Sequence, residues 1–127
     1  MHYVTTKDGR LAAVINNRLI DIGAASIALG GAAPCKDMWA LLESSQKVQQ
    51  ELDTLAQKAY EQQLASVVYE PQLVGSPLTY LRRNVLCIGK NYVDHAVEIA
   101  DKMGISADLP KYPIVFSKAT KTLIGPL

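Results

Sequence analysis

Charge of one sign is not in excess in this 127-residue sequence. Its 13 basic and 12 acidic side chains leave a formal net charge of +1, which is too small to attract phosphate backbones or anionic lipids. Long hydrophobic runs are also missing, because no window approaches about 18 uninterrupted apolar residues and no apolar run follows a basic amino terminus. We therefore expect no nucleic-acid partner, no membrane partner and a cytoplasmic location.

Cysteine is scarce as well. Cys35 and Cys87 are far apart, and neither belongs to a CxxC pair, so the sequence supports neither a zinc site nor a disulfide framework. Two free thiols fit a reducing compartment. Apolar residues make up 49% of the chain and charged residues 20%, as in globular proteins. We expect a folded chain with one domain, or a small domain and part of another.

The first 22 residues of the sequence have the pattern of a β-meander. Short β-branched or apolar runs cover residues 3–6, 11–15 and 18–22. They are separated by Lys7-Asp8-Gly9-Arg10 and by Asn16-Asn17, and Gly and Asn tolerate the positive φ values of tight hairpin turns. The spacing predicts three antiparallel strands.

Two or three helices should follow the meander. A short helix is expected within residues 23–33 and should stop at Leu29-Gly30-Gly31. A second helix should start at Met38, with Asp37 as its cap. Ser44 or Ser45 can cap the third helix. This third helix is amphipathic and roughly 18 residues long, or about 27 Å. Its predicted apolar stripe is Val48, Leu52, Leu55, Ala59 and Gln62, and its predicted polar side is Gln49, Glu51, Asp53, Lys58 and Glu61.

Residues 70–79 have the composition of a linker, with two prolines and a glycine. We therefore predict a leading α+β domain over 1–76 and a second region over 77–127. In the second region, the apolar runs 84–89 and 113–116 suit strands buried on both faces. A helix over 93–103, with Gly104 as its stop, should lie between them.

Polar chemistry is densest just after the run 84–89. His95 and Glu98 are three residues apart, a spacing that puts both side chains on one helix face. The carboxylate could then hold the imidazole in one tautomer and raise its basicity, so that the pair deprotonates a water molecule. The alternative is a chance pair on a solvated helix, because this spacing is common.

Residues 87–98 read C-I-G-K-N-Y-V-D-H-A-V-E. This stretch resembles the signature of the fumarylacetoacetate hydrolase family, in which a strand leads into G-x-N-Y-x-x-H-x-x-E. The run 113–118, P-I-V-F-S-K, is similar to the next strand of that family, and 124–126, I-G-P, also fits. The resemblance covers about 84–126, and the segment before it suits the variable leading domain of the family.

The resemblance implies an α+β fold in which the leading domain precedes the first strands of a mixed, β-rich catalytic domain. It also implies a hydrolase, decarboxylase or isomerase that acts on carbon–carbon bonds next to carbonyls in small oxo-acids, as in aromatic compound catabolism. His95 would be the general base, oriented by Glu98, and Lys118, Lys90 and Tyr92 would bind substrate. Without the resemblance, Lys118 would be interpreted as a surface lysine at a strand end.

The family normally holds a divalent ion, commonly Mg²⁺ and otherwise Mn²⁺ or Ca²⁺. Its ligands are two glutamates separated by one residue and a later aspartate, all downstream of the lysine strand. No E-x-E follows Lys118, so we expect no cofactor in this chain. We predict a fragment of an enzyme, inactive in isolation, whose uncovered apolar strands favour a homo-oligomer such as a homodimer.

Two other interpretations compete with this one. The chain could be a non-catalytic interaction or assembly module derived from the family, and the residues encoded beyond Leu127 would decide between the two. Nucleotide binding through Gly89-Lys90 fails because the G-x-x-x-x-G-K-[ST] pattern is missing. The identity of the oxo-acid and the reaction type stay open. The enzymatic interpretation fails if the His95 ring is packed in apolar surroundings, or if it points away from Glu98 and Lys118 with no shared cleft.

Overall fold

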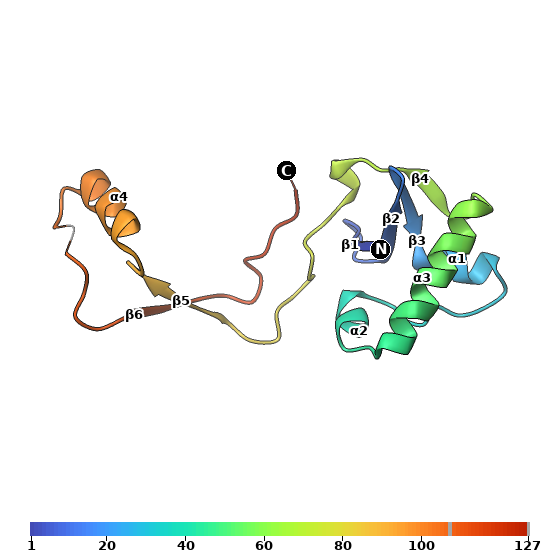
Figure 1. Ribbon diagram of the computed structural model, residues 1–127, viewed down its shortest axis with the longest axis horizontal. Helices are drawn as coiled ribbons and strands as arrows, with labels where there is room; N and C mark the ends of the chain where they lie inside the picture. Colours follow the sequence, from blue (N-terminus) through green and yellow to red (C-terminus); the bar gives the residue numbers. More distant parts are fainter. Residues whose placement is uncertain (107, 127) are drawn as a thin grey trace. The chain divides into compact units, whose positions relative to one another are not determined.

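The computed structural model describes residues 1–106 and 108–126, which form two compact units. The first unit comprises Met1–Tyr80 and residues 123–126, and the second is Leu81–Thr122 (Figure 1). The first unit combines an antiparallel sheet with helices, and the described part of the second combines an antiparallel sheet with one helix. The predicted α+β class is therefore confirmed. The domain boundary between residues 76 and 77 stays a prediction.

A four-stranded antiparallel sheet forms the base of the first unit. Its strands, in spatial order, are β1 (His2–Thr5), β2 (Leu11–Ile15), β3 (Arg18–Asp21) and β4 (Ser66–Val68). The meander is confirmed. Its second turn puts Asn16 at φ 45° and Asn17 at φ 60°, values that a two-residue hairpin loop with the right twist requires.

Three helices pack beside this sheet: α1 (Ile22–Ala28), α2 (Met38–Leu42) and α3 (Gln46–Glu61). The carboxylate of Asp37 accepts a hydrogen bond from the Ala40 amide at 2.8 Å, and the Ser45 hydroxyl accepts one from the Val48 amide at 3.4 Å. Both predicted caps are confirmed. None of the helices in the described part of the chain is long and apolar enough to cross a membrane.

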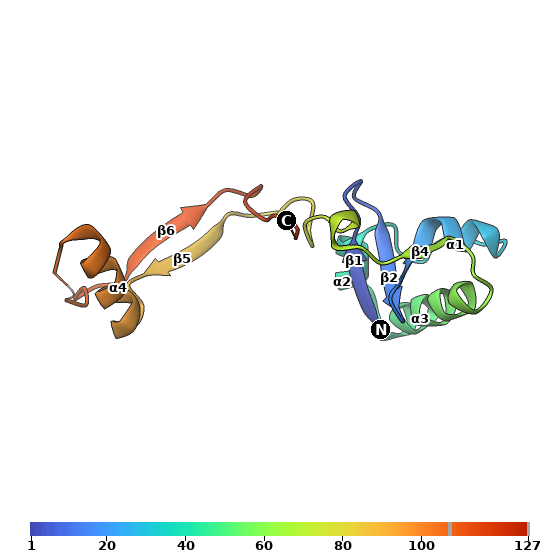
Figure 2. The same ribbon diagram turned by 90° about the horizontal axis from the view of Figure 1, so that it is seen from above.

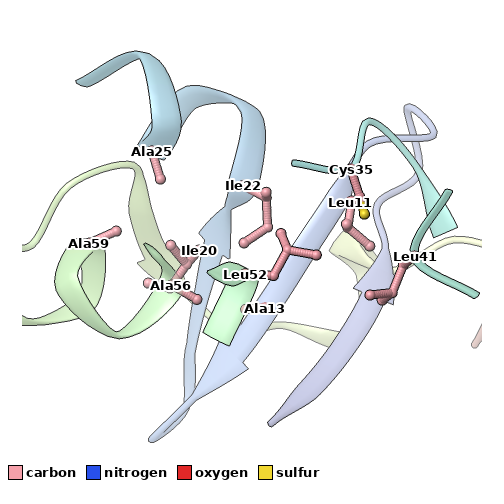
Figure 3. Packing of buried hydrophobic residues seen from close by; sticks show 10 residues of the cluster. All are labelled: Leu11, Ala13, Ile20, Ile22, Ala25, Cys35, Leu41, Leu52, Ala56 and Ala59. Carbon is pink, nitrogen blue, oxygen red and sulfur yellow. The ribbon is translucent and has the colours of Figure 1, made fainter. Parts of the chain in front are cut away.

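The core of the first unit lies between the sheet, α1 and α3 (Figure 3). Ile20 of β3 and Ile22 of α1 lie in one cluster with Leu52, Ala56 and Ala59 of α3, and all five are fully buried. The apolar stripe of α3 is thus close to the predicted one, with Ala56 added.

Two positions of the predicted amphipathic helix were predicted wrongly. Asp53 is half-buried and accepts a hydrogen bond from the Tyr3 hydroxyl at 2.8 Å, because a phenol next to the core needs an acceptor. Burial, and then Asp53, raise the pKa of Tyr3 well above its ordinary range. Gln62 is exposed and is the C-cap of the helix, because the helix has 16 residues and ends at Glu61.

After the short 3-10 helix η1 (Pro71–Leu73), Gly75 passes along β1. The Gly75 amide donates to the Thr5 carbonyl at 2.8 Å. Gly125 lies against Gly75, so close that a β-carbon on Gly125 would be 2.5 Å from the Gly75 carbonyl carbon. Residues 123–126 therefore belong to the first unit, although they follow the second unit in sequence.

The second unit is a two-stranded ribbon with one helix. Strands β5 (Val85–Gly89) and β6 (Ile114–Lys118) pair antiparallel, and α4 (Val93–Met103) lies between them in sequence (Figure 2). Gly104 ends α4 with φ 64°, so this helix and its stop are confirmed. The two strands were predicted to be buried on both faces, and this is wrong. Leu86 is 76% exposed and Val115 is 61% exposed. In the part of the chain that the structure describes, the ribbon has only two strands and no second layer to cover them.

Candidate active site

The candidate site begins where β5 ends. Gly89 closes the strand, Lys90 turns the chain with a φ of 48°, and Tyr92 is the N-cap of α4. A positive φ at a residue other than glycine is uncommon, and such turns often occur at functional sites. Ala96 and Ala100 of α4 are buried, whereas His95 and Glu98 are not. The helix thereby presents the predicted pair on its open side.

The His95 ring faces Glu98. Its Nδ1 lies 3.8 Å from Glu98 Oε2, and the His95 side chain is 38% exposed. This distance suits an ion pair with a protonated ring but is too long for a hydrogen bond. The Tyr92 ring also lies close to the imidazole, with ring centroids 5.4 Å apart and a 32° tilt. The imidazole is therefore neither buried among apolar groups nor turned away from the carboxylate.

Glu98 has a second partner, Lys102, which was not among the predicted site residues. The Lys102 ammonium donates to Glu98 Oε1 at 2.6 Å. This hydrogen bond is the main cause of a lowered pKa of Glu98, and His95 contributes less. The signal was present in the sequence, since a glutamate four residues before a lysine is the favoured order for a helical ion pair. Glu98 is thus an ionised carboxylate between two basic side chains.

Lys118 is not brought to His95. In the ribbon it pairs with Val85, at the opposite end of β5 from Gly89, and four strand residues span about 13 Å. The Lys90 ammonium lies 3.5 Å from the Ser106 carbonyl oxygen, at the end that leads into α4. The structure therefore brings His95, Glu98 and Tyr92 together but does not bring Lys118 to them. The chemical role of each of these residues stays a prediction.

A metal ion does not fit the residues at hand. Within residues 1–106 and 108–126, no group of three or more His, Cys, Asp or Glu side chains could hold one. Near the pair, Glu98 is already engaged by Lys102. No chemical step is therefore assigned to a metal.

No protein-family model matches the chain. It is 46% identical over 50 residues to oxaloacetate tautomerase YisK from Bacillus subtilis, a match covering 39% of this chain and 15% of that protein. Human mitochondrial oxaloacetate tautomerase FAHD2B is 33% identical over 73 residues, or 58% of this chain and 21% of that protein. These matches support the resemblance of this chain to part of a fumarylacetoacetate hydrolase family protein.

The matches span about a fifth or less of the length of these two relatives. One similar solved structure is of a protein from Mycobacterium smegmatis that is described as an HpcE protein. The match covers 93% of this chain and 36% of the solved chain, at 27% sequence identity. Its TM-score is 0.39, which is too low to support any statement about the fold.

Proposed function

We propose that this chain is part of an enzyme that interconverts the keto and enol forms of a small oxo-acid, with oxaloacetate as the first candidate. The observation that carries the proposal is the His95–Glu98 pair, with 3.8 Å between Nδ1 and Oε2. Among hydrolysis, decarboxylation and isomerisation, the names of the relatives favour isomerisation. A cytoplasmic location stays a prediction.

The geometry suits proton transfer at carbon. An ionised Glu98 favours the tautomer of His95 whose proton is on Nδ1, and this leaves the lone pair of Nε2 free to act as a base. In the proposed step, Nε2 takes a proton from the carbon next to the substrate carbonyl. The C–H electron pair forms the C=C bond, the carbonyl pair moves to oxygen, and that oxygen takes a proton from water to give the enol. The imidazolium then returns the abstracted proton to the hydroxide, which restores water and the neutral base.

Lys90 and Tyr92 would bind the substrate. The Lys90 ammonium suits a carboxylate of an oxo-diacid and the negative charge that develops on the enolate oxygen. Lys118 has no role in this step, because it lies at the other end of β5. Tyr92, whose ring already lies against His95, would close one side of the site. The family's Mg²⁺, or Mn²⁺ or Ca²⁺, would need ligands other than the groups described above, and no part of this step depends on it.

The test is the rate of enol-to-keto conversion, followed by enol absorbance, in the gene product that contains this sequence. His95→Gln should lower kcat/KM by about 10²- to 10⁴-fold, the usual contribution of a general base. Asp101→Asn, which changes a neighbouring acid on α4, is the matched control. Wild-type activity in His95→Gln would refute the proposal. The 127-residue chain alone, assayed with added Mg²⁺, should show no robust turnover.

A second candidate function is assembly, and one face of the β5–β6 ribbon favours it. Leu86, Ile88 and Val115 share this face through their register, and they are 76%, 54% and 61% exposed. Uncovered apolar surface of this kind tends to find a partner, so we propose a homo-oligomer. Light scattering should show association that Ile88→Lys weakens and Ile27→Lys, at a 77% exposed residue of the first unit, does not. A monomer at high concentration would contradict it.

A further inference from the structure

Three polar side chains lie along one stripe of α4. His95, Glu98 and Lys102 are spaced at i, i+3 and i+7, which places them on one face of a helix. Glu98 is the middle member, and each of its oxygens has a different neighbour: Oε2 faces His95 Nδ1 at 3.8 Å, and Oε1 accepts from Lys102 Nζ at 2.6 Å. Among the described residues, these are the charged and titratable groups that contact the carboxylate.

The two contacts of Glu98 are unequal. A hydrogen bond of 2.6 Å between an ammonium and a carboxylate is charge-assisted and short, whereas 3.8 Å to the imidazole exceeds hydrogen-bond range. The Glu98 side chain is 57% exposed, so without a partner it would sample several rotamers. The contact that restrains its carboxylate is therefore the one to Lys102.

Lys102 is itself well placed to stay in position. It lies in the last turn of α4, which ends at Gly104, and the carbonyl groups at a helix C-terminus favour a cation there. The ammonium thus has two favourable interactions, one with the helix end and one with Glu98. Neither depends on His95 or on a bound substrate.

We propose that Lys102 is a positioning residue of the candidate active site, whose ammonium holds the Glu98 carboxylate in the orientation that faces His95. This inference rests on the proposed function and names a further residue of the same site. Lys102 touches neither the imidazole nor the reacting atoms in this scheme. It acts through Glu98, which selects the Nδ1-protonated tautomer of His95.

The test compares the 127-residue chain with Lys102→Met, Lys102→Arg and Lys111→Met by NMR. In Lys102→Met the pKa of Glu98, read from its carboxyl carbon, should rise because its main stabilising partner is lost. The fraction of His95 with its proton on Nδ1, read from the ring nitrogen shifts, should fall. Lys102→Arg should retain both wild-type values. Lys111→Met removes the same charge from a residue next to the Tyr112 ring and should change neither.

A second measurement covers the case in which Lys102→Met unfolds α4. The pair is exposed and therefore screened by salt, so 1 M salt should raise the pKa of Glu98 in the unchanged chain. The inference is overturned if the pKa of Glu98 stays constant in Lys102→Met, or if His95→Gln raises it more than Lys102→Met does. These readouts need no turnover, so they separate this inference from a failure of the proposed function.

In the active gene product, rescue by the conservative variant adds a kinetic readout. Lys102→Met should lower kcat/KM, because the Glu98 carboxylate is then held less firmly beside His95. Lys102→Arg should restore the wild-type value, because its guanidinium can make the same contact with Glu98.

Discussion

Strands β2 and β5 have nearly the same composition, Leu-Ala-Ala-Val-Ile and Val-Leu-Cys-Ile-Gly, yet they differ in burial. β2 has a neighbouring strand on each side and helices over one face, and its first three residues are buried. β5 has one neighbour, and none of its residues is buried. The apolar sequence is equally suited to either environment, so burial here depends on how many layers surround the strand.

The same contrast separates the two units. The first contains a cluster of ten buried residues drawn from the sheet, the helices and the loop that carries Cys35. In the described part of the second, Ala96 and Ala100 are the buried residues. Stability therefore resides mainly in the first unit, while the candidate active site lies in the second. The following substitutions can break or sharpen this comparison.

The largest effect is expected at Leu52, which is fully buried in the first unit. Leu52→Ala should lower the free energy of unfolding by about 2–5 kcal/mol, because it leaves a cavity in the core. The counterpart in the second unit is Ile88→Ala, at a residue that is 54% exposed, and it should change the value by about 0.5 kcal/mol or less. Urea unfolding of both variants measures the difference. Equal losses would show that the two units do not differ in packing.

A smaller effect is expected at Gly125. A β-carbon there would meet the Gly75 carbonyl carbon at 2.5 Å, so Gly125→Ala should cost about 1–3 kcal/mol through overpacking. It should also release residues 123–126 from the first unit, which amide hydrogen exchange would detect. Gly31→Ala is the control, because the nearest atom to a β-carbon at Gly31 is 3.8 Å away. Unchanged exchange at 123–126 would show that the contact does not hold this segment.

The smallest effect is expected at Tyr3. Tyr3→Phe removes the hydrogen bond to Asp53 and should cost about 1 kcal/mol. Burial, followed by Asp53, raises the pKa of Tyr3 in the folded state. The neutral phenol is therefore favoured on folding, and this stabilisation is complete below the unfolded pKa near about 10 and is lost as pH rises above it. Thermal unfolding between pH 8 and about 11 should thus decline less in Tyr3→Phe, and identical pH curves would contradict this.

Much of the local structure was predictable because its causes are local. The Asn16-Asn17 turn, the caps Asp37 and Ser45 and the stop at Gly104 follow from the backbone preferences and hydrogen-bonding groups of those residues alone. Asp53 was assigned to the solvated side of its helix because the helical period cannot show that a tyrosine from β1 needs an acceptor at that point.

For the candidate site, the sequence determined that His95 and Glu98 share a helix face, since residues three apart on a helix are always neighbours. It also contained the Glu98–Lys102 spacing. Only the tertiary structure decided which strands are covered by a second layer. It also decided that Lys118 pairs with Val85, and that residues 123–126 belong to the first unit. Such contacts join residues far apart in the chain, and they depend on strand register and layer packing, which no local preference specifies.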